Sequence, residues 1–92
     1  YLTKQQTADL IQRMVPELAA RQATKLAEFT ALCQTAFAAR EITLPFSARQ
    51  YIPIAKMAVA FLDMKRAIQY NFINSLDEKD ASAVTGFVNS VW

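Results

Sequence analysis

Positions 44–50, with the sequence LPFSARQ, hold the residues of this chain best suited to bind a ligand. Pro45 holds the residue before it extended. Ser47 and Gln50 have the spacing of a capping box, which predicts that a helix begins here. Arg49 then falls in the first turn, where unpaired backbone N–H groups and the helix dipole attract anions. Its guanidinium would suit phosphate oxygens; the alternative is an ordinary solvated cation.

The rest of the chain offers few groups for catalysis. It contains no histidine, which removes the commonest general base and metal ligand. With one glycine it has no glycine-rich phosphate loop, and no apolar strand ends in paired acids that could hold Mg²⁺. Ser47 has no evident base to activate it as a nucleophile. We therefore expect no catalytic residue within these 92 residues, and neither hydrolysis nor tight binding of ATP by them alone.

Two further features have a chemical and a structural interpretation. Asp77, Glu78 and Asp80 could form a metal cluster, but they lack the spacing and glycine of a calcium loop. Acidic residues are favourable at the start of a helix, so we expect a capping role and no metal site. Cys33 is the single cysteine, which excludes an internal disulfide, and we expect a buried thiol in a reducing compartment.

The composition predicts one all-α domain. Hydrophobic residues make up 53% of the 92 residues, with one glycine and three prolines, too apolar for disorder and too poor in turn residues for a β-sandwich. Both ends suggest a domain taken from a larger protein, since the chain begins with tyrosine and ends in an apolar stripe.

Charge and hydropathy limit the partners. Ten basic and eight acidic residues are spread along the chain, and Lys65-Arg66 is the one adjacent basic pair, so we expect no nucleic-acid partner. The longest apolar run, residues 57–62, is too short to cross a bilayer. No secretory signal is visible, and we expect a cytoplasmic protein without a membrane partner.

Capping signals and apolar periodicity predict five helices. The first opens at Thr3 and ends near Val15. The second begins at residue 18 or 19, runs to about residue 40 and packs antiparallel to the first. A short extended segment at 41–46 follows, too short for a sheet. The third helix spans 48 to about 62, the fourth is capped by Asp63 and ends near Leu76, and the fifth is capped by Asp77.

The third helix is apolar almost all round, which predicts that it is the centre of the bundle. Tyr51, Met57 and Phe61 could line an apolar cofactor slot, or they could be ordinary core residues. Pro53 removes one backbone hydrogen bond and crowds the carbonyl of Arg49, so we expect a kink or an irregular first turn.

The order of these elements resembles a known family. Leu-Pro-Phe at 44–46, then Ser47-x-Arg49 opening an apolar helix after a two-helix hairpin, resembles the sensor-2 region of AAA+ ATPases, in the MoxR-like and cobaltochelatase-like branch. Tyr1-Leu2 resembles the exit from an ATPase core into its helical lid, and residues 63–80 resemble the lid's last two helices. Pro53 departs from the family pattern.

The resemblance implies a five-helix lid domain, residues 1–92, from the C-terminal part of a larger ATPase. Its Arg49 would contact the γ-phosphate of ATP, with Ser47 as the cap that positions it. ATP and Mg²⁺ would be held by a P-loop core outside this chain, which itself lacks Walker A and Walker B motifs. Hydrolysis would move the lid against a core and thereby remodel a client protein. That core would belong either to the same subunit or to a neighbouring subunit of a hexameric ring. An alternative from another class is a freestanding helical adaptor that docks a partner in an apolar groove, without nucleotide.

Overall fold

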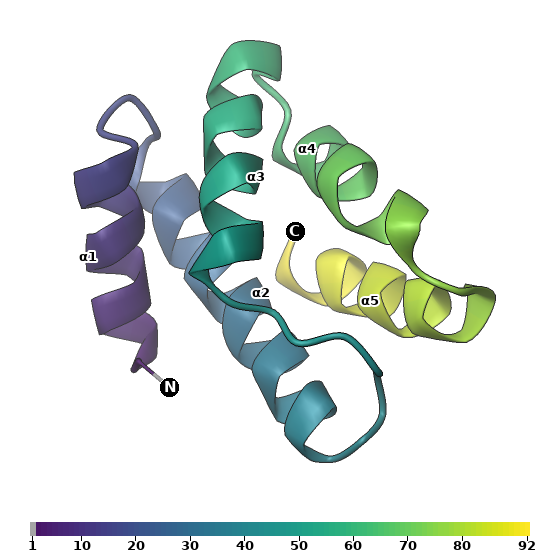
Figure 1. The fold of residues 1–92 in the computed structure, drawn as a ribbon. Coiled ribbons are helices and arrows are strands. Elements are labelled where there is room, and N and C mark those ends of the chain that lie inside the picture. Colours follow the sequence, from purple (N-terminus) through teal and green to yellow (C-terminus); the bar gives the residue numbers. More distant parts are fainter. Residues whose placement is uncertain (1) are drawn as a thin grey trace.

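The computed structural model describes residues 2–92, which form five α-helices and a short 3₁₀ turn (Figure 1). In chain order these are α1 (Lys4–Met14), α2 (Ala20–Ala38), α3 (Ala48–Phe61), α4 (Met64–Asn71), the 3₁₀ turn η1 (Ile73–Ser75) and α5 (Glu78–Val91). These residues contain no strand, so the expected all-α helical bundle is confirmed.

α1 and α2 form the expected antiparallel hairpin (Figure 1). The Thr3 hydroxyl accepts a hydrogen bond from the Gln6 N–H at 3.1 Å, and the Gln6 side chain accepts from the Thr3 N–H at 2.9 Å. α2 begins at Ala20 and ends at Ala38, within two residues of the predicted bounds. Arg40 then adopts a left-handed backbone conformation (φ 62°), which turns the chain out of the helix.

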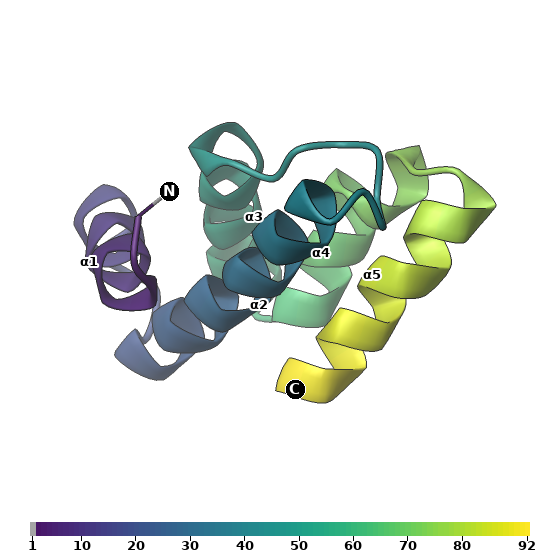
Figure 2. The ribbon, with the colours of Figure 1, turned by 90° about the horizontal axis from the view of Figure 1, so that it is seen from below.

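The loop between α2 and α3 is irregular rather than a strand (Figure 2). The sequence predicted a short extended segment at 41–46, and the structure has bends there instead. Ile42 and Phe46 are buried, whereas Leu44 is exposed. The Phe46 ring packs edge-on to Phe29, with centroids 5.4 Å apart, so the loop is anchored in the core by its own side chains.

α3 begins where the sequence predicted and continues through Pro53 as one α-helix. The N–H groups of Gln50 and Tyr51 both donate to the Ser47 carbonyl, so the expected irregular first turn is not found. Pro53 is the sixth residue of the helix and is exposed. Because proline has no N–H, one hydrogen bond, to the carbonyl of Arg49, is lost. The turns before and after Pro53 keep their helical conformation.

The prediction that α3 is buried all round is wrong. One face of it is buried, formed by Tyr51, Ile54, Ala55 and Ala58. α1 and α4 flank α3 and α2 lies behind it (Figure 1), so one side faces outward. The larger share of the core comes from α2, whose buried residues are Ala23, Leu26, Ala27, Phe29, Thr30, Cys33 and Ala36.

The predicted fourth helix ends five residues early, at Asn71. Phe72 leaves helical geometry, with φ −133° and ψ −59°, and its ring packs against Phe46 at 4.7 Å between centroids. The predicted caps are confirmed. The Asp63 carboxylate accepts from the Arg66 N–H at 3.1 Å, and the Asp77 carboxylate accepts from the Asp80 N–H at 2.8 Å.

Candidate functional site

Arg49 is the second residue of α3 and is exposed. Gln50 fixes the start of this helix, since its side-chain oxygen accepts from both the backbone N–H and the hydroxyl of Ser47, each at 2.9 Å. The Ser47 carbonyl accepts from the N–H groups of Gln50 and Tyr51, at 2.8 and 3.0 Å. Arg49 therefore stands at a rigid helix N-terminus, where the dipole attracts anions.

The loop that leads to Arg49 is held from two sides. On the α2 side, the Gln34 side-chain amide donates to the Phe46 carbonyl at 3.1 Å. On the α5 side, one carboxylate oxygen of Asp80 accepts from the Thr43 N–H at 3.1 Å and from the Thr43 hydroxyl at 2.5 Å. Charged acceptors make the stronger hydrogen bonds in proteins. The position of Arg49 thus depends on two helices other than its own.

The sequence did not predict the burial of Asp80 or its contact with Thr43. Asp80 was predicted only as a first-turn acid of α5, but it is 2% exposed and bonds to a residue 37 positions earlier in the chain. The hydrogen bonds from the Thr43 hydroxyl and N–H, helped by the Lys79 charge and opposed by burial, hold the pKa of Asp80 below its ordinary value. No local pattern marks this role, because the partner lies in another part of the sequence.

The acidic residues near 77–80 do not converge. Asp77 caps α5, whereas Asp80 points to the α2–α3 loop and Glu78 is exposed. Among residues 2–92, no three His, Cys, Asp or Glu side chains are placed to hold a metal ion. None of the helices in this range is both long and apolar enough to span a bilayer.

Cys33 is buried on α2, as predicted, with its thiol unpaired. Burial raises the pKa of this thiol to about 12. A thiol that stays protonated at neutral pH is a poor nucleophile and metal ligand, so Cys33 acts as a small core residue.

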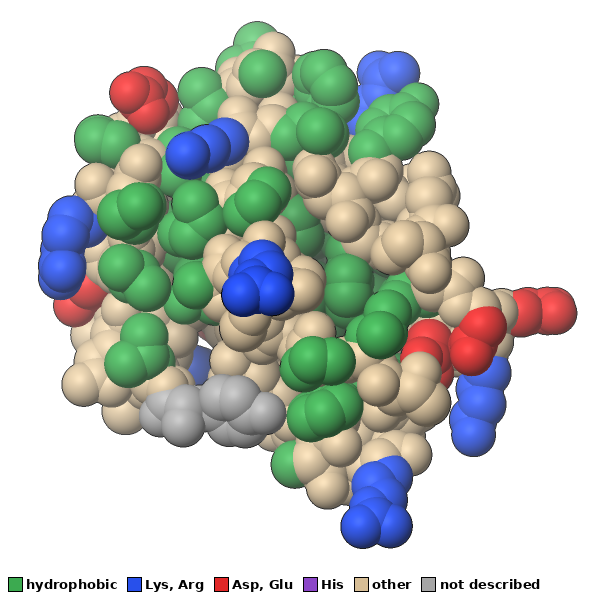
Figure 3. Space-filling model, in the orientation of Figure 1, with side chains coloured by type: hydrophobic (Ala, Val, Ile, Leu, Met, Phe, Trp, Pro, Cys, Tyr) green, Lys and Arg blue, Asp and Glu red, His purple; other side chains and the backbone are tan. Residues whose placement is uncertain are grey.

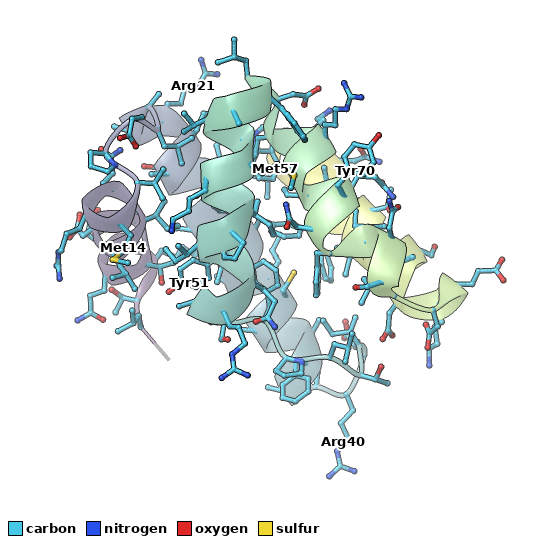
Figure 4. The ribbon with its side chains drawn as sticks, turned by 45° about the horizontal axis from the view of Figure 1, so that its top comes forward. Met14, Arg21, Arg40, Tyr51, Met57 and Tyr70 are labelled. Atoms are coloured by element: carbon cyan, nitrogen blue, oxygen red, sulfur yellow. The ribbon has the colours of Figure 1, made fainter. Side chains whose placement is uncertain are left out.

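The three residues considered for a cofactor slot face different neighbours. Figure 4 labels two of them, Tyr51 and Met57, on α3. The Tyr51 ring lies 6.3 Å from that of Phe46, and the Met57 sulfur accepts a hydrogen bond from the Asn71 side chain at 2.9 Å. Phe61 packs on Tyr70. They do not line a common slot, and the core interpretation holds for Tyr51.

An exposed aromatic cluster lies where α3 meets α4. Phe61 and Tyr70 are 48% and 52% exposed, with ring centroids 6.3 Å apart, and the Arg66 guanidinium lies 5.7 and 5.5 Å from the two centroids. Leu62, the next residue after Phe61 in the chain, is 90% exposed. Figure 3 shows hydrophobic side chains over much of the face formed by α1, α3 and α4. We call Phe61, Leu62, Arg66 and Tyr70 the corner cluster.

Comparisons of the chain with protein-family models, curated proteins and solved structures find no match. The fold therefore defines the class of protein only as an all-α helical bundle. Its assignment to a family is a proposal. Tyr1, which the family resemblance includes, lies outside the residues that the structure describes.

Proposed function

We propose that this chain is the C-terminal lid of an AAA+ ATPase of the MoxR-like or cobaltochelatase-like branch. The observation that carries the proposal is Arg49, an exposed arginine in the first turn of a capped helix that follows an anchored loop. The presence of five α-helices, the number that the resemblance implies, supports it. So does the scarcity of catalytic groups, since a lid lends an arginine to a site that another domain completes.

In this function the Arg49 guanidinium contacts the γ-phosphate of ATP. The charge that develops on the phosphoryl group during hydrolysis would be stabilised by this guanidinium, whose backbone position is fixed by the capping box of α3. ATP and Mg²⁺ belong to a P-loop core outside this chain. When the γ-phosphate leaves, Arg49 loses its partner, and the lid can move against the core of its own subunit or of a neighbour in a hexameric ring. That motion would remodel a client protein.

The test uses the full-length protein and the 92 residues in parallel. The full-length protein should carry Walker A and Walker B motifs before Tyr1 and hydrolyse ATP, whereas the 92 residues should show no micromolar ATP binding by calorimetry. A full-length protein without these motifs contradicts the proposal. Tight ATP binding by the 92 residues contradicts the assignment of the phosphate and metal ligands to another domain.

A second candidate is a freestanding helical adaptor, and the corner cluster is the observation that favours it. Exposed apolar patches often mark interaction surfaces, and Phe61, Leu62 and Tyr70 are all exposed at one corner of the molecule. An adaptor needs no nucleotide. It therefore predicts a full-length protein without ATPase activity, in which Arg49→Ala changes nothing and substitution of the corner cluster abolishes function.

A further inference from the structure

One buried charged group has no part in the proposed function as stated. Asp80 is 2% exposed on α5, whereas the neighbouring acids Asp77 and Glu78 are exposed. A carboxylate is expensive to bury unless hydrogen bonds compensate it, and here two bonds from Thr43 do so. An acidic side chain in the first turn interacts favourably with the helix dipole even when it is exposed to solvent. The stabilisation of the start of α5 therefore does not explain why Asp80 is buried.

The geometry links Asp80 to the start of α3. Thr43, which it holds, is separated from Ser47 by three residues, and the last of these, Phe46, is buried and bonded to Gln34. Ser47 is in turn bonded to Gln50 in the first turn of α3. Hydrogen-bonded or buried residues at 43, 46 and 47, with the exposed Leu44 and Pro45 between the first two, thus connect α5 to the helix end that carries Arg49.

We propose that Asp80 is a positioning residue, which holds the α2–α3 loop through Thr43 and thereby fixes the N-terminus of α3 and Arg49 on it. The functional half of this proposal rests on the proposed role of Arg49. The structural half does not, since it concerns only what keeps the loop and the helix end in place. α5 would then influence ATP turnover without touching nucleotide.

The structural half is tested by amide hydrogen exchange on the 92-residue chain. Asp80→Ala should speed the exchange of the hydrogen-bonded amides within 43–50 that lie at the start of α3, those of Ser47 and Gln50, by about tenfold or more, the scale of a lost charged hydrogen bond, and leave α1 unchanged. Glu78→Ala is the matched control, because it removes the same charge from the same turn of α5 without a contact to the loop. It should leave amides 43–50 unchanged.

A second pair of variants covers the case in which Asp80→Ala does not fold. Thr43→Val replaces the hydroxyl by a methyl group and should speed the exchange of the same amides. Thr43→Ser keeps both donors to Asp80, the N–H and the hydroxyl, and should exchange at the wild-type rate. Acceleration spread equally over all helices would mean that Asp80 supports general stability, and would overturn the proposal. Unchanged exchange at 43–50 in the folded variants would overturn it as well.

The functional half is tested in the full-length ATPase. Asp80→Ala should lower ATP turnover, and it should lower it no further in a protein that already carries Arg49→Ala. Equal losses in both backgrounds would show that Asp80 acts independently of Arg49. If Arg49→Ala alone has no effect, the proposed function fails, and the exchange experiment still decides whether Asp80 holds the helix end.

Discussion

At the scale of single residues, one carboxylate joins two distant parts of the chain. The Asp80–Thr43 contact spans 37 positions and ties α5 to the loop before α3. The local sequence predicted that Asp80 is an acid in the first turn of a helix and that Thr43 lies in a short extended segment. Nothing in either pattern indicates that the two residues pair. Arg49 and Ser47 differ in this respect, because a capping box is complete within four residues and can be found in the sequence.

The lowered pKa of Asp80 predicts how stability changes with pH. Its folded value lies below its unfolded value of about 4, so the ionised group stabilises the fold above that pH and loses this contribution as pH falls through the folded value. The free energy of unfolding of wild type should exceed that of Asp80→Asn at pH 7, and the difference should shrink below about pH 4. Urea titrations at several pH values measure it.

Glu78→Gln is the control for this pH experiment. It removes a charge from the same helix turn but breaks no bond to the loop. A difference between wild type and Asp80→Asn that stays constant down to about pH 2 would contradict the assigned pKa direction.

At the scale of the elements, helix starts were predictable and helix ends were less so. Ser47, Asp63 and Asp77 precede helices where the sequence indicated, because each cap acts on its own first turn. The end of α4 depends on Phe72, which packs on Phe46 from the α2–α3 loop. Such an ending is set by tertiary packing, which periodicity does not report.

Gly86 gives a prediction at this scale. It lies inside α5, is exposed, and an added Cβ would meet no atom within 4 Å. Gly86→Ala should therefore raise the free energy of unfolding by about 0.5–1 kcal/mol, since alanine loses less backbone entropy in a helix. For a domain of this size, that corresponds to a rise of several degrees in Tm. A calorimetric Tm that is unchanged or lower would show that Gly86 has a role in the fold.

The burial of α3 gives another prediction. Ile54 is 0% exposed, whereas Ile52 is only partly buried. Ile54→Ala should cost about 2–5 kcal/mol of stability in urea unfolding, and Ile52→Ala, the matched control, clearly less. Equal losses would contradict the observed orientation of the helix.

At the scale of the whole molecule, the all-α class followed from composition, but the arrangement of the helices did not. The apolar residues of α3 suggested a central helix, yet Phe61 and Leu62 are exposed and α2 supplies more of the core. Burial depends on which neighbours cover a helix, and this is a property of the assembled bundle. The same holds for the corner cluster, whose members come from both sides of the α3–α4 junction.

The proposed function also belongs to this scale, because it assigns the chain to a larger assembly. ATP, Mg²⁺, a P-loop core and neighbouring subunits would all lie outside the residues described. In the proposed function, this chain would contribute one guanidinium on an anchored helix end. The proposed function therefore depends on Arg49.

ATP turnover of the full-length protein with Arg49→Ala tests this claim most directly. Arg21→Ala is the matched control, because Arg21 is also an exposed arginine at the second position of a helix, α2. Both variants should keep the wild-type Tm within error, as expected for exposed cations. Arg49→Ala should lower turnover by about 10³–10⁵, the range known for arginine fingers, and Arg49→Lys should restore only part of it. Equal turnover in wild type, Arg49→Ala and Arg21→Ala would contradict the sensor role and leave Arg49 as an ordinary surface cation.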